Sequence, residues 1–106
     1  MITYMEQTDI QDFNDAVEKV KRLASRPDDG ELLILYGYYK QSVFGDNKAS
    51  QPSIFSVKER SKWGAWENNK MMSRKQARQN YIVFVDTLVV KYGFTPIIQS
   101  SQIDIV

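Results

Sequence analysis

The sequence predicts an all-α protein, a single domain folded as a four-helix bundle. Apolar residues recur at three- and four-residue spacing in four separate segments of the chain. Helix-starting residues precede these segments, and glycine or proline follows them. The 106 residues are enough for one domain with a sizeable core, but not for two. We therefore expect one domain over residues 1–106, with its core at about 9–93 and a C-terminal tail at 94–106.

The first helix is expected from Thr8 to Ala24. Thr8 and Gln11, three residues later, match the capping box found at helix starts. Pro27 disfavours helical geometry in the residue before it and ends this region. One buried stripe is formed by the apolar residues of the segment, Ile10, Phe13, Ala16, Val17, Val20, Leu23 and Ala24.

The second helix is expected from Asp29 to Phe44, where Gly45 stops it. Asp28 or Asp29 can cap its first turn. It contains the run LLILYGYYKQSVFG, in which three tyrosines are followed by a lysine and a glutamine. Aromatic residues at helical spacing most often belong to a core. Leu35 and Val43 are expected there.

A loop is expected between Gly45 and Ser56, because turn-forming residues and the second proline of the chain gather there. Ile54 and Phe55 are expected to anchor it in the core. Loops of this length in small domains are often functional, although this one could simply cross the surface.

The third helix is expected from Ser56 through Lys70. Ser56 and Glu59 form a second capping box at its start. Trp63 and Trp66 are three residues apart and should therefore face the same way.

The fourth helix follows Ser73, which forms a third capping box with Gln76. Its run YIVFVDTLVVKYGF is rich in β-forming residues and favours strands when read alone. The spacing of its apolar residues and the helix stop at Gly93 favour a helix instead. These residues are four, three and four positions apart: Tyr81, Val85, Leu88 and Tyr92.

Composition excludes several classes of enzyme. The chain has no cysteine and no histidine, so disulfides, thiolate–metal sites and Ser–His or Cys–His catalysis are ruled out. It has no glycine-rich phosphate loop, and helix capping explains the acids at the start of the second helix. We expect a protein that is not an enzyme, with no metal and no cofactor.

Hydropathy predicts a cytoplasmic protein. No apolar run approaches the length of a membrane span. The N-terminal residues lack the basic start and apolar centre of a signal peptide.

Charge is unevenly distributed, although the formal net charge is only +1. Residues 40–78 hold nine Lys or Arg and three acidic residues, a net charge of +6. The remaining residues hold five basic and ten acidic residues, a net charge of −5. A basic middle in a nearly neutral chain indicates one local anionic partner rather than nucleic-acid binding, although solvated helix faces would give the same pattern.

Lysines and tyrosines from different expected helices could converge on such a partner. Lys40 lies one helical turn after Tyr36, so a cation and an aromatic ring share one side of the second helix. A bundle could gather further members around one polyanion. The set is Lys21, Lys40 and Lys62 with Tyr36, Tyr39 and Tyr81.

The chain resembles the acyl-CoA-binding proteins, small four-helix carriers of long-chain acyl-CoA esters. The resemblance runs from about Phe13 to Gly93, and its most specific elements are YxxYKQ and KWxAW in this order. The matching positions are Pro27, the run Tyr36–Gln41, Gly45-Asp46, Pro52, the run Lys62–Trp66, Tyr81 and the run Lys91–Gly93. Gly64 departs from the family pattern, where an Asp is usual. The resemblance implies a four-helix bundle of the acyl-CoA-binding protein type.

The resemblance also implies roles for individual residues. Tyr39 would stack on the adenine of coenzyme A, and Tyr36 and Lys40 would contact the region of the ribose 3′-phosphate. The full nucleotide and phosphate set would be Lys21, Tyr36, Tyr39, Lys40, Lys62 and Tyr81. The acyl chain would lie along Phe13, Ala16, Val17, Asp29, Leu32 and Leu33. Trp63 and Trp66 would be mainly structural.

The implied function is the binding, sequestration and transport of long-chain acyl-CoA without catalysis. The alternative is a protein-interaction module that uses the basic face or the apolar fourth helix. Val83 and Val90 lie seven residues apart, outside the buried stripe of that helix. They could bind the isoleucines of the tail or a second subunit, so we expect a monomer with possible self-association through the fourth helix or the tail.

Overall fold

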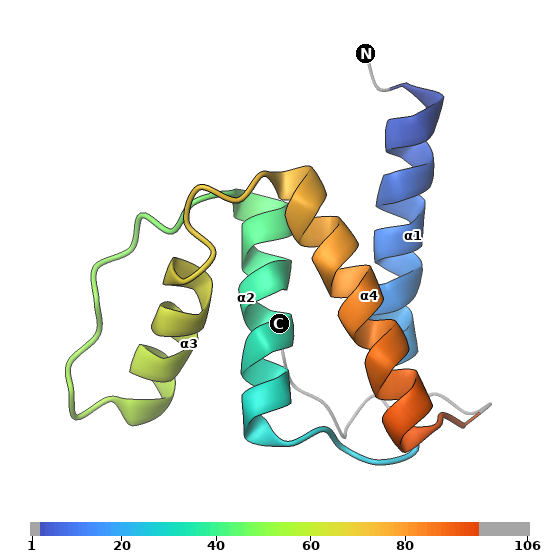
Figure 1. Cartoon of the computed structure of the whole chain (residues 1–106). Helices are drawn as coiled ribbons and strands as arrows, with labels where there is room; N and C mark the ends of the chain where they lie inside the picture. The colour runs from blue at the N-terminus through green and yellow to red at the C-terminus, as the bar shows by residue number, and fades with distance from the viewer. Residues whose placement is uncertain (1–2, 96–106) are drawn as a thin grey trace.

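Four helices make up the fold in our computed structural model, which describes residues 3–95 (Figure 1). They are α1 (Tyr4–Val20), α2 (Asp29–Phe44), α3 (Val57–Glu67) and α4 (Arg74–Tyr92). Within the described residues the only β pairing is one isolated bridge between Leu23 and Phe94. The predicted all-α class is therefore confirmed. The predictions for residues 96–106 lie outside the described residues, and the single-domain organisation stays a prediction.

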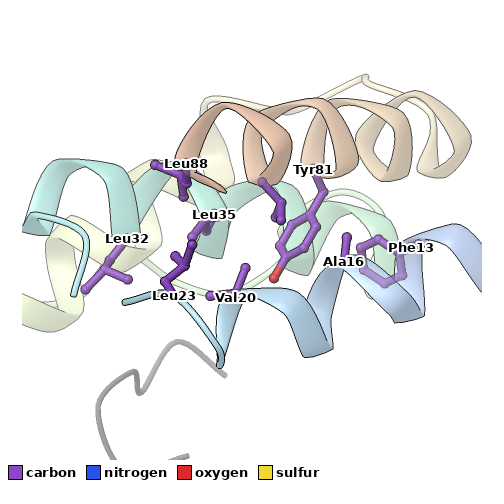
Figure 2. Packing of buried hydrophobic residues seen from close by; sticks show 9 residues of the cluster. Phe13, Ala16, Val20, Leu23, Leu32, Leu35, Tyr81 and Leu88 are labelled. Atoms are coloured by element: carbon purple, nitrogen blue, oxygen red, sulfur yellow. The ribbon is translucent and has the colours of Figure 1, made fainter. Parts of the chain in front are cut away.

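The helices are arranged around α2 and α4 (Figure 1). α4 packs against both α1 and α2, whereas α3 packs against α2 alone among the described helices. An ion pair also joins α1 to α4, since Arg78 Nε lies 2.5 Å from Asp9 Oδ2. The core fills the space between α1, α2 and α4 (Figure 2). Its buried members are Phe13, Ala16, Val20, Leu23, Leu32, Leu35, Tyr81, Val85 and Leu88.

The start predicted for α1 was wrong. The helix begins at Tyr4 because Thr3 caps it, with its hydroxyl accepting a 3.1 Å hydrogen bond from the Glu6 amide. Thr8, the predicted cap, lies inside the helix and donates to the Tyr4 carbonyl. The helix also ends at Val20, before the predicted Ala24, because the next three amides bond to carbonyls three residues back rather than four. The Ala24 amide then bonds to the Gly93 carbonyl.

The bounds of α2 and α4 confirm the sequence prediction. Asp28 and Glu31 form a reciprocal capping box at the start of α2. Ser73 caps α4 by accepting from the Gln76 amide at 3.0 Å. α4 continues as a helix through its β-rich run because its apolar stripe is buried against α1 and α2. It ends at Gly93, where a φ of 70° suits glycine.

The third helix is shorter than predicted. It begins at Val57, but the Ser56 side chain makes no capping hydrogen bond. It ends at Glu67 rather than Lys70, and the chain then turns through Met71, whose φ is 76°. The Met71 amide is held by Asp46 Oδ1 at 2.8 Å, which draws the chain away from a further helical turn.

Two predictions of burial were wrong. Ile54 and Phe55 do not anchor the loop before α3, since they are 65% and 89% exposed. Polar contacts hold that loop, because the indole nitrogens of Trp63 and Trp66 donate to the carbonyls of Ala49 and Gly45 at 2.8 Å each. Leu35 is buried as predicted. Val43, in the last turn of α2, keeps 38% of its surface exposed.

Candidate functional site

The close approach of α2 and α3 depends on Gly37. A β-carbon at this position would lie 2.4 Å from the carbonyl oxygen of Ala65 in α3. No real side chain fits at that distance, so a glycine is needed for the two backbones to pack. Gly64, the family departure in α3, has open space around it instead.

The contact between α2 and α3 leaves a cavity of about 590 Å³ near the N-terminal halves of both helices. This volume is in the range of small-molecule sites. Its lining combines aliphatic side chains with charged ones. The lining residues are Arg26, Asp29, Leu32, Leu33, Tyr36, Val57, Lys58, Ser61 and Lys62.

Five residues assigned to the ligand from the sequence line this cavity: Asp29, Leu32, Leu33, Tyr36 and Lys62. The sequence analysis missed four others, Arg26, Val57, Lys58 and Ser61. Helical spacing could have identified two of these. Lys58 and Ser61 lie four and one residues before Lys62 in α3, so Lys58 shares its face and Ser61 adjoins it.

Two lysines lie near the ring of Tyr36, of which Lys62 lines the cavity and Lys40 does not. The Nζ of Lys62 lies 4.9 Å from the ring centroid, and that of Lys40 lies 5.9 Å from it. Lys40 also lies 4.3 Å from the Phe44 ring and 4.8 Å from that of Trp66. Neither lysine makes an ion pair with a described residue. Both amines are therefore held by aromatic faces, with their charge not neutralised by a carboxylate.

The Tyr36 hydroxyl stays protonated between these lysines. Burial raises the pKa of Tyr36, and the negative charge of Glu59 adds to the increase. A protonated hydroxyl donates hydrogen bonds, as the lysine amines do. Tyr36 and Lys62 therefore give the cavity two donors at this end, and Lys40, near the same ring, adds a third beside the cavity. Such a set suits an anion.

Other predicted ligand residues lie on the opposite side of α2. Tyr39 stacks on Phe13 with a centroid distance of 6.0 Å, and Tyr81 packs edge-on against Phe13 at 5.1 Å. Phe13, Ala16 and Tyr81 are buried in the core, and Val17 is packed against it. None of these side chains lines the cavity between α2 and α3. Their assigned ligand contacts stay predictions.

Tyr81 is the least accessible of them. Its hydroxyl is buried and has no hydrogen-bond partner within residues 3–95. Burial raises the pKa of Tyr81 well above its ordinary value, with smaller contributions from Tyr39 and Glu18. Figure 2 shows the ring pointing from α4 toward α1.

Lys21 also lies away from the cavity. It follows the last residue of α1 as its C-cap, and its Nζ lies 2.9 Å from Glu18 Oε2. That exposed pair is weak, so the amine can exchange its partner for another anion. Its assigned role toward phosphate stays a prediction.

Gln41 and Asp46, which belong to the YKQ and GD motifs, have a structural role. The buried Gln41 amide donates to Asp46 Oδ1 at 2.9 Å and to the Met72 carbonyl at 2.8 Å. The hydrogen bond from Gln41, followed by that from the Met71 amide, lowers the pKa of Asp46. This network ties the end of α2 to the segment before α4.

Glu31 ties the start of α2 to the end of α4. Lys91 Nζ donates to its Oε2 at 2.8 Å, and the Tyr92 hydroxyl donates to its Oε1. These bonds, with the amide of Asp28 as a third donor, lower the pKa of Glu31 to about 2. The carboxylate is therefore fully charged at neutral pH and serves the fold.

No described helix is long and apolar enough to cross a membrane. The described His, Cys, Asp and Glu residues form no group of three or more that could hold a metal ion.

Comparison with known proteins identifies the family. The model of the family "Acyl CoA binding protein" matches residues 10–85. The "Acyl-CoA-binding protein homolog" of Drosophila melanogaster is 46% identical over 83 residues, which cover 78% of this chain and 96% of the relative. The "Acyl-CoA-binding protein" of Saccharomyces cerevisiae is 45% identical over 81 residues, 76% of this chain and 93% of the relative.

Solved structures agree with this comparison. The crystal structure of Oryza sativa Acyl-CoA-Binding Protein 2 matches with a TM-score of 0.81 at 31% identity, covering 84% of this chain and 97% of that one. The solution structure of the yeast Acyl Coenzyme A Binding Protein matches with a TM-score of 0.62 at 44% identity, covering 76% of this chain and 94% of that one. Sequence and fold lead to one conclusion, that this chain belongs to the acyl-CoA-binding protein family.

Proposed function

We propose that this protein binds long-chain fatty acyl-CoA esters reversibly and carries them between the sites where they are made and used. Membership of the acyl-CoA-binding protein family supports binding and transport, and the interaction-module alternative is not favoured. The observation that carries the proposal is the two-part character of the cavity between α2 and α3. Aliphatic side chains line one part, and Tyr36 and Lys62 line the other, with Lys40 near the Tyr36 ring just outside the lining.

The acyl chain lies in the aliphatic part, along Leu32, Leu33 and Val57. Each methylene removed from water there contributes about 0.8 kcal/mol. About eight buried methylenes would contribute roughly 6 kcal/mol gross, which is more than a thousandfold in affinity. The chain therefore separates acyl-CoA from free coenzyme A.

The phosphates of coenzyme A meet Lys62, Lys40 and the Tyr36 hydroxyl. A hydrogen bond to a charged group contributes roughly 1.5–3 kcal/mol. The amines of Lys40 and Lys62 have no ion pair with a described residue to break before they form such a bond. Tyr39, Lys21 and Tyr81 complete the nucleotide site in this proposal, with adenine stacking on Tyr39 contributing roughly 1–3 kcal/mol. Phe13, Ala16, Val17 and Asp29 complete the acyl side.

The protein acts without turnover. The family is one of carriers, and acyl-CoA is their ligand rather than a cofactor. The thioester passes through unchanged, and delivery requires only dissociation. We propose that the protein acts as a monomer in the cytoplasm.

Calorimetric titration with palmitoyl-CoA and with free coenzyme A tests the proposal. We expect tight one-to-one binding of the ester and binding weaker by a thousandfold or more for coenzyme A, because only the ester fills the aliphatic part of the cavity. Absence of heat from the ester, or equal affinity for the two ligands, would contradict it.

A further inference from the structure

A cluster of exposed apolar side chains stands beside the cavity without a partner. Ile54, Phe55 and Val57 are 65%, 89% and 70% exposed, respectively. They lie where the long loop enters α3, and we name these three residues the apolar tip. In Figure 1 this part of the chain lies at the same end of the molecule as the start of α2.

The backbone under the apolar tip is held in place by hydrogen bonds. The amides of Phe55 and Ser56 donate to the hydroxyl and carbonyl of Ser53 at 3.1 and 3.0 Å, respectively. The guanidinium of Arg60 donates to the Pro52 carbonyl at 2.9 Å. The loop is therefore already ordered before any partner binds, and this lowers the entropic cost of docking.

Positive charge follows the apolar tip along α3. Lys58, Arg60 and Lys62 follow it on α3, against one acid, Glu59. None of the three cations is in an ion pair with a described residue. Apolar side chains next to unpaired cations suit the boundary of an anionic bilayer, where the first enter the lipid and the second meet the headgroups.

The apolar tip is continuous with the cavity. Val57 belongs to both, and Lys58, the next residue, also lines the cavity. We propose that the tip docks the protein on anionic membrane surfaces and brings the mouth of the cavity to the lipid boundary. This inference rests on the proposed function for its purpose, because an acyl-CoA in a bilayer has its chain in the lipid and its nucleotide in water. A docked protein can take up or release such a ligand without exposing the chain to water.

A bilayer fits the apolar tip better than a protein partner does. A stable protein interface buries roughly 800 Å² on each partner, with matched shapes. Three side chains at one junction of loop and helix are too few for that area. A fluid bilayer needs no matched shape, and the insertion of apolar side chains adds to the attraction between nearby cations and anionic lipids.

Flotation of the full chain with vesicles tests the proposal, without acyl-CoA present. We expect binding to phosphatidylcholine vesicles that contain phosphatidylserine, weaker binding to pure phosphatidylcholine, and release by salt. Phe55→Ser should weaken the binding about tenfold, because it removes the largest inserted side chain. Val90→Ser is the matched control, since Val90 is 87% exposed on α4, and it should bind as the unmodified protein does.

Calorimetry of the same variants separates this proposal from the proposed function. Phe55→Ser should keep its affinity for palmitoyl-CoA in solution, since Phe55 does not line the cavity, while extraction of palmitoyl-CoA from vesicles slows. If the unmodified protein bound vesicles but not palmitoyl-CoA, the proposed function alone would fail.

Three results would overturn the membrane proposal. The first is no binding of the unmodified protein to anionic vesicles, and the second is an equal loss with Val90→Ser. The third is self-association that depends on Phe55 and occurs without vesicle binding, which would make a second copy of the chain the partner.

Discussion

The two sides of α2 differ in how they pack. On one side α2 meets α4 and, through side chains, α1, and nine buried residues fill the space between them. On the other side it meets α3, which has no buried residue of its own. Gly37 lets the backbones of these two helices approach closely, and the cavity opens beside that contact.

This difference puts the core on one side of α2 and the cavity on the other, with Leu32 belonging to both. The side of α2 that faces α1 and α4, which we call the dry side, supplies most of the buried apolar area. It therefore supplies most of the free energy of folding. The side that faces α3, which we call the hollow side, presents aliphatic surface and unpaired cations to a ligand. Substitutions on the two sides of α2 should therefore have different effects.

Leu35→Ala should give the largest effect. Leu35 is fully buried on the dry side of α2, so its truncation should lower the free energy of unfolding by roughly 2–5 kcal/mol. Urea denaturation measures this loss. The protein that stays folded should bind palmitoyl-CoA as before. If the measured affinity fell by more than the loss of folded protein accounts for, the two sides of α2 would be coupled.

Lys40→Ala should show the opposite pattern. We expect affinity for palmitoyl-CoA to fall by roughly 1.5–3 kcal/mol, the contribution of a hydrogen bond to a charged group. Stability should change little, because Lys40 makes no ion pair with a described residue and only lies over aromatic rings. Tyr36→Phe, which removes one hydroxyl, should weaken binding with little change in stability. A large drop in melting temperature would show that these residues are structural.

Gly37→Ala should disturb only the hollow side. Its methyl group would collide with the Ala65 carbonyl, so α3 must move, at a cost of roughly 1–3 kcal/mol. Calorimetry should show weaker palmitoyl-CoA binding. The near-UV circular dichroism of Trp63 and Trp66, which lie on α3, should change, while the helix content measured in the far UV stays the same. Gly64→Ala is the control in α3, because its methyl group meets nothing and should stabilise the helix by about 0.5–1 kcal/mol. Equal effects of both substitutions would contradict this account of Gly37.

Tyr81→Phe should increase stability by about 1 kcal/mol, because it removes a buried hydroxyl that lacks a partner among residues 3–95. Thermal unfolding measures the increase. Palmitoyl-CoA titration of the same variant tests the ligand role assigned to Tyr81 from the family resemblance. Unchanged affinity would place this residue with the core, whereas weaker binding would show that the ligand reaches its hydroxyl.

Acid should have a smaller effect, through Glu31. Its pKa is held at about 2, mainly by the hydrogen bonds from Lys91 and Tyr92, whereas the ordinary value is 4.5. A lowered pKa in the folded state contributes stability above the ordinary value, and that contribution is lost as pH falls from 4.5 toward 2. Urea denaturation across this range should show the loss, and Glu31→Gln should flatten that part of the profile. A parallel decline in the variant would assign it to other acids.

Local sequence predicted the helices well where capping and burial agreed. Asp28 with Glu31 marks the start of α2, and Gly45 marks its end. α1 was misplaced because its first turn is exposed, with Tyr4 at 79% and Met5 at 73%, so no buried apolar stripe marks where the helix begins. Phe55 was misjudged because a lone aromatic residue in a loop gives no sign of the face on which the loop lies.

The sequence by itself determined the all-α class, the family and the lysine and tyrosine residues that could meet a nucleotide. These follow from periodicity and from motifs, which are local properties of the chain. Only the tertiary structure decided which of them share a cavity. It placed Tyr36 and Lys62 together across α2 and α3, and it placed Tyr39 on the core side with Tyr81. Helical spacing predicts on which face of its helix a residue lies. It does not predict which other helix covers that face, because this depends on how the separate helices pack.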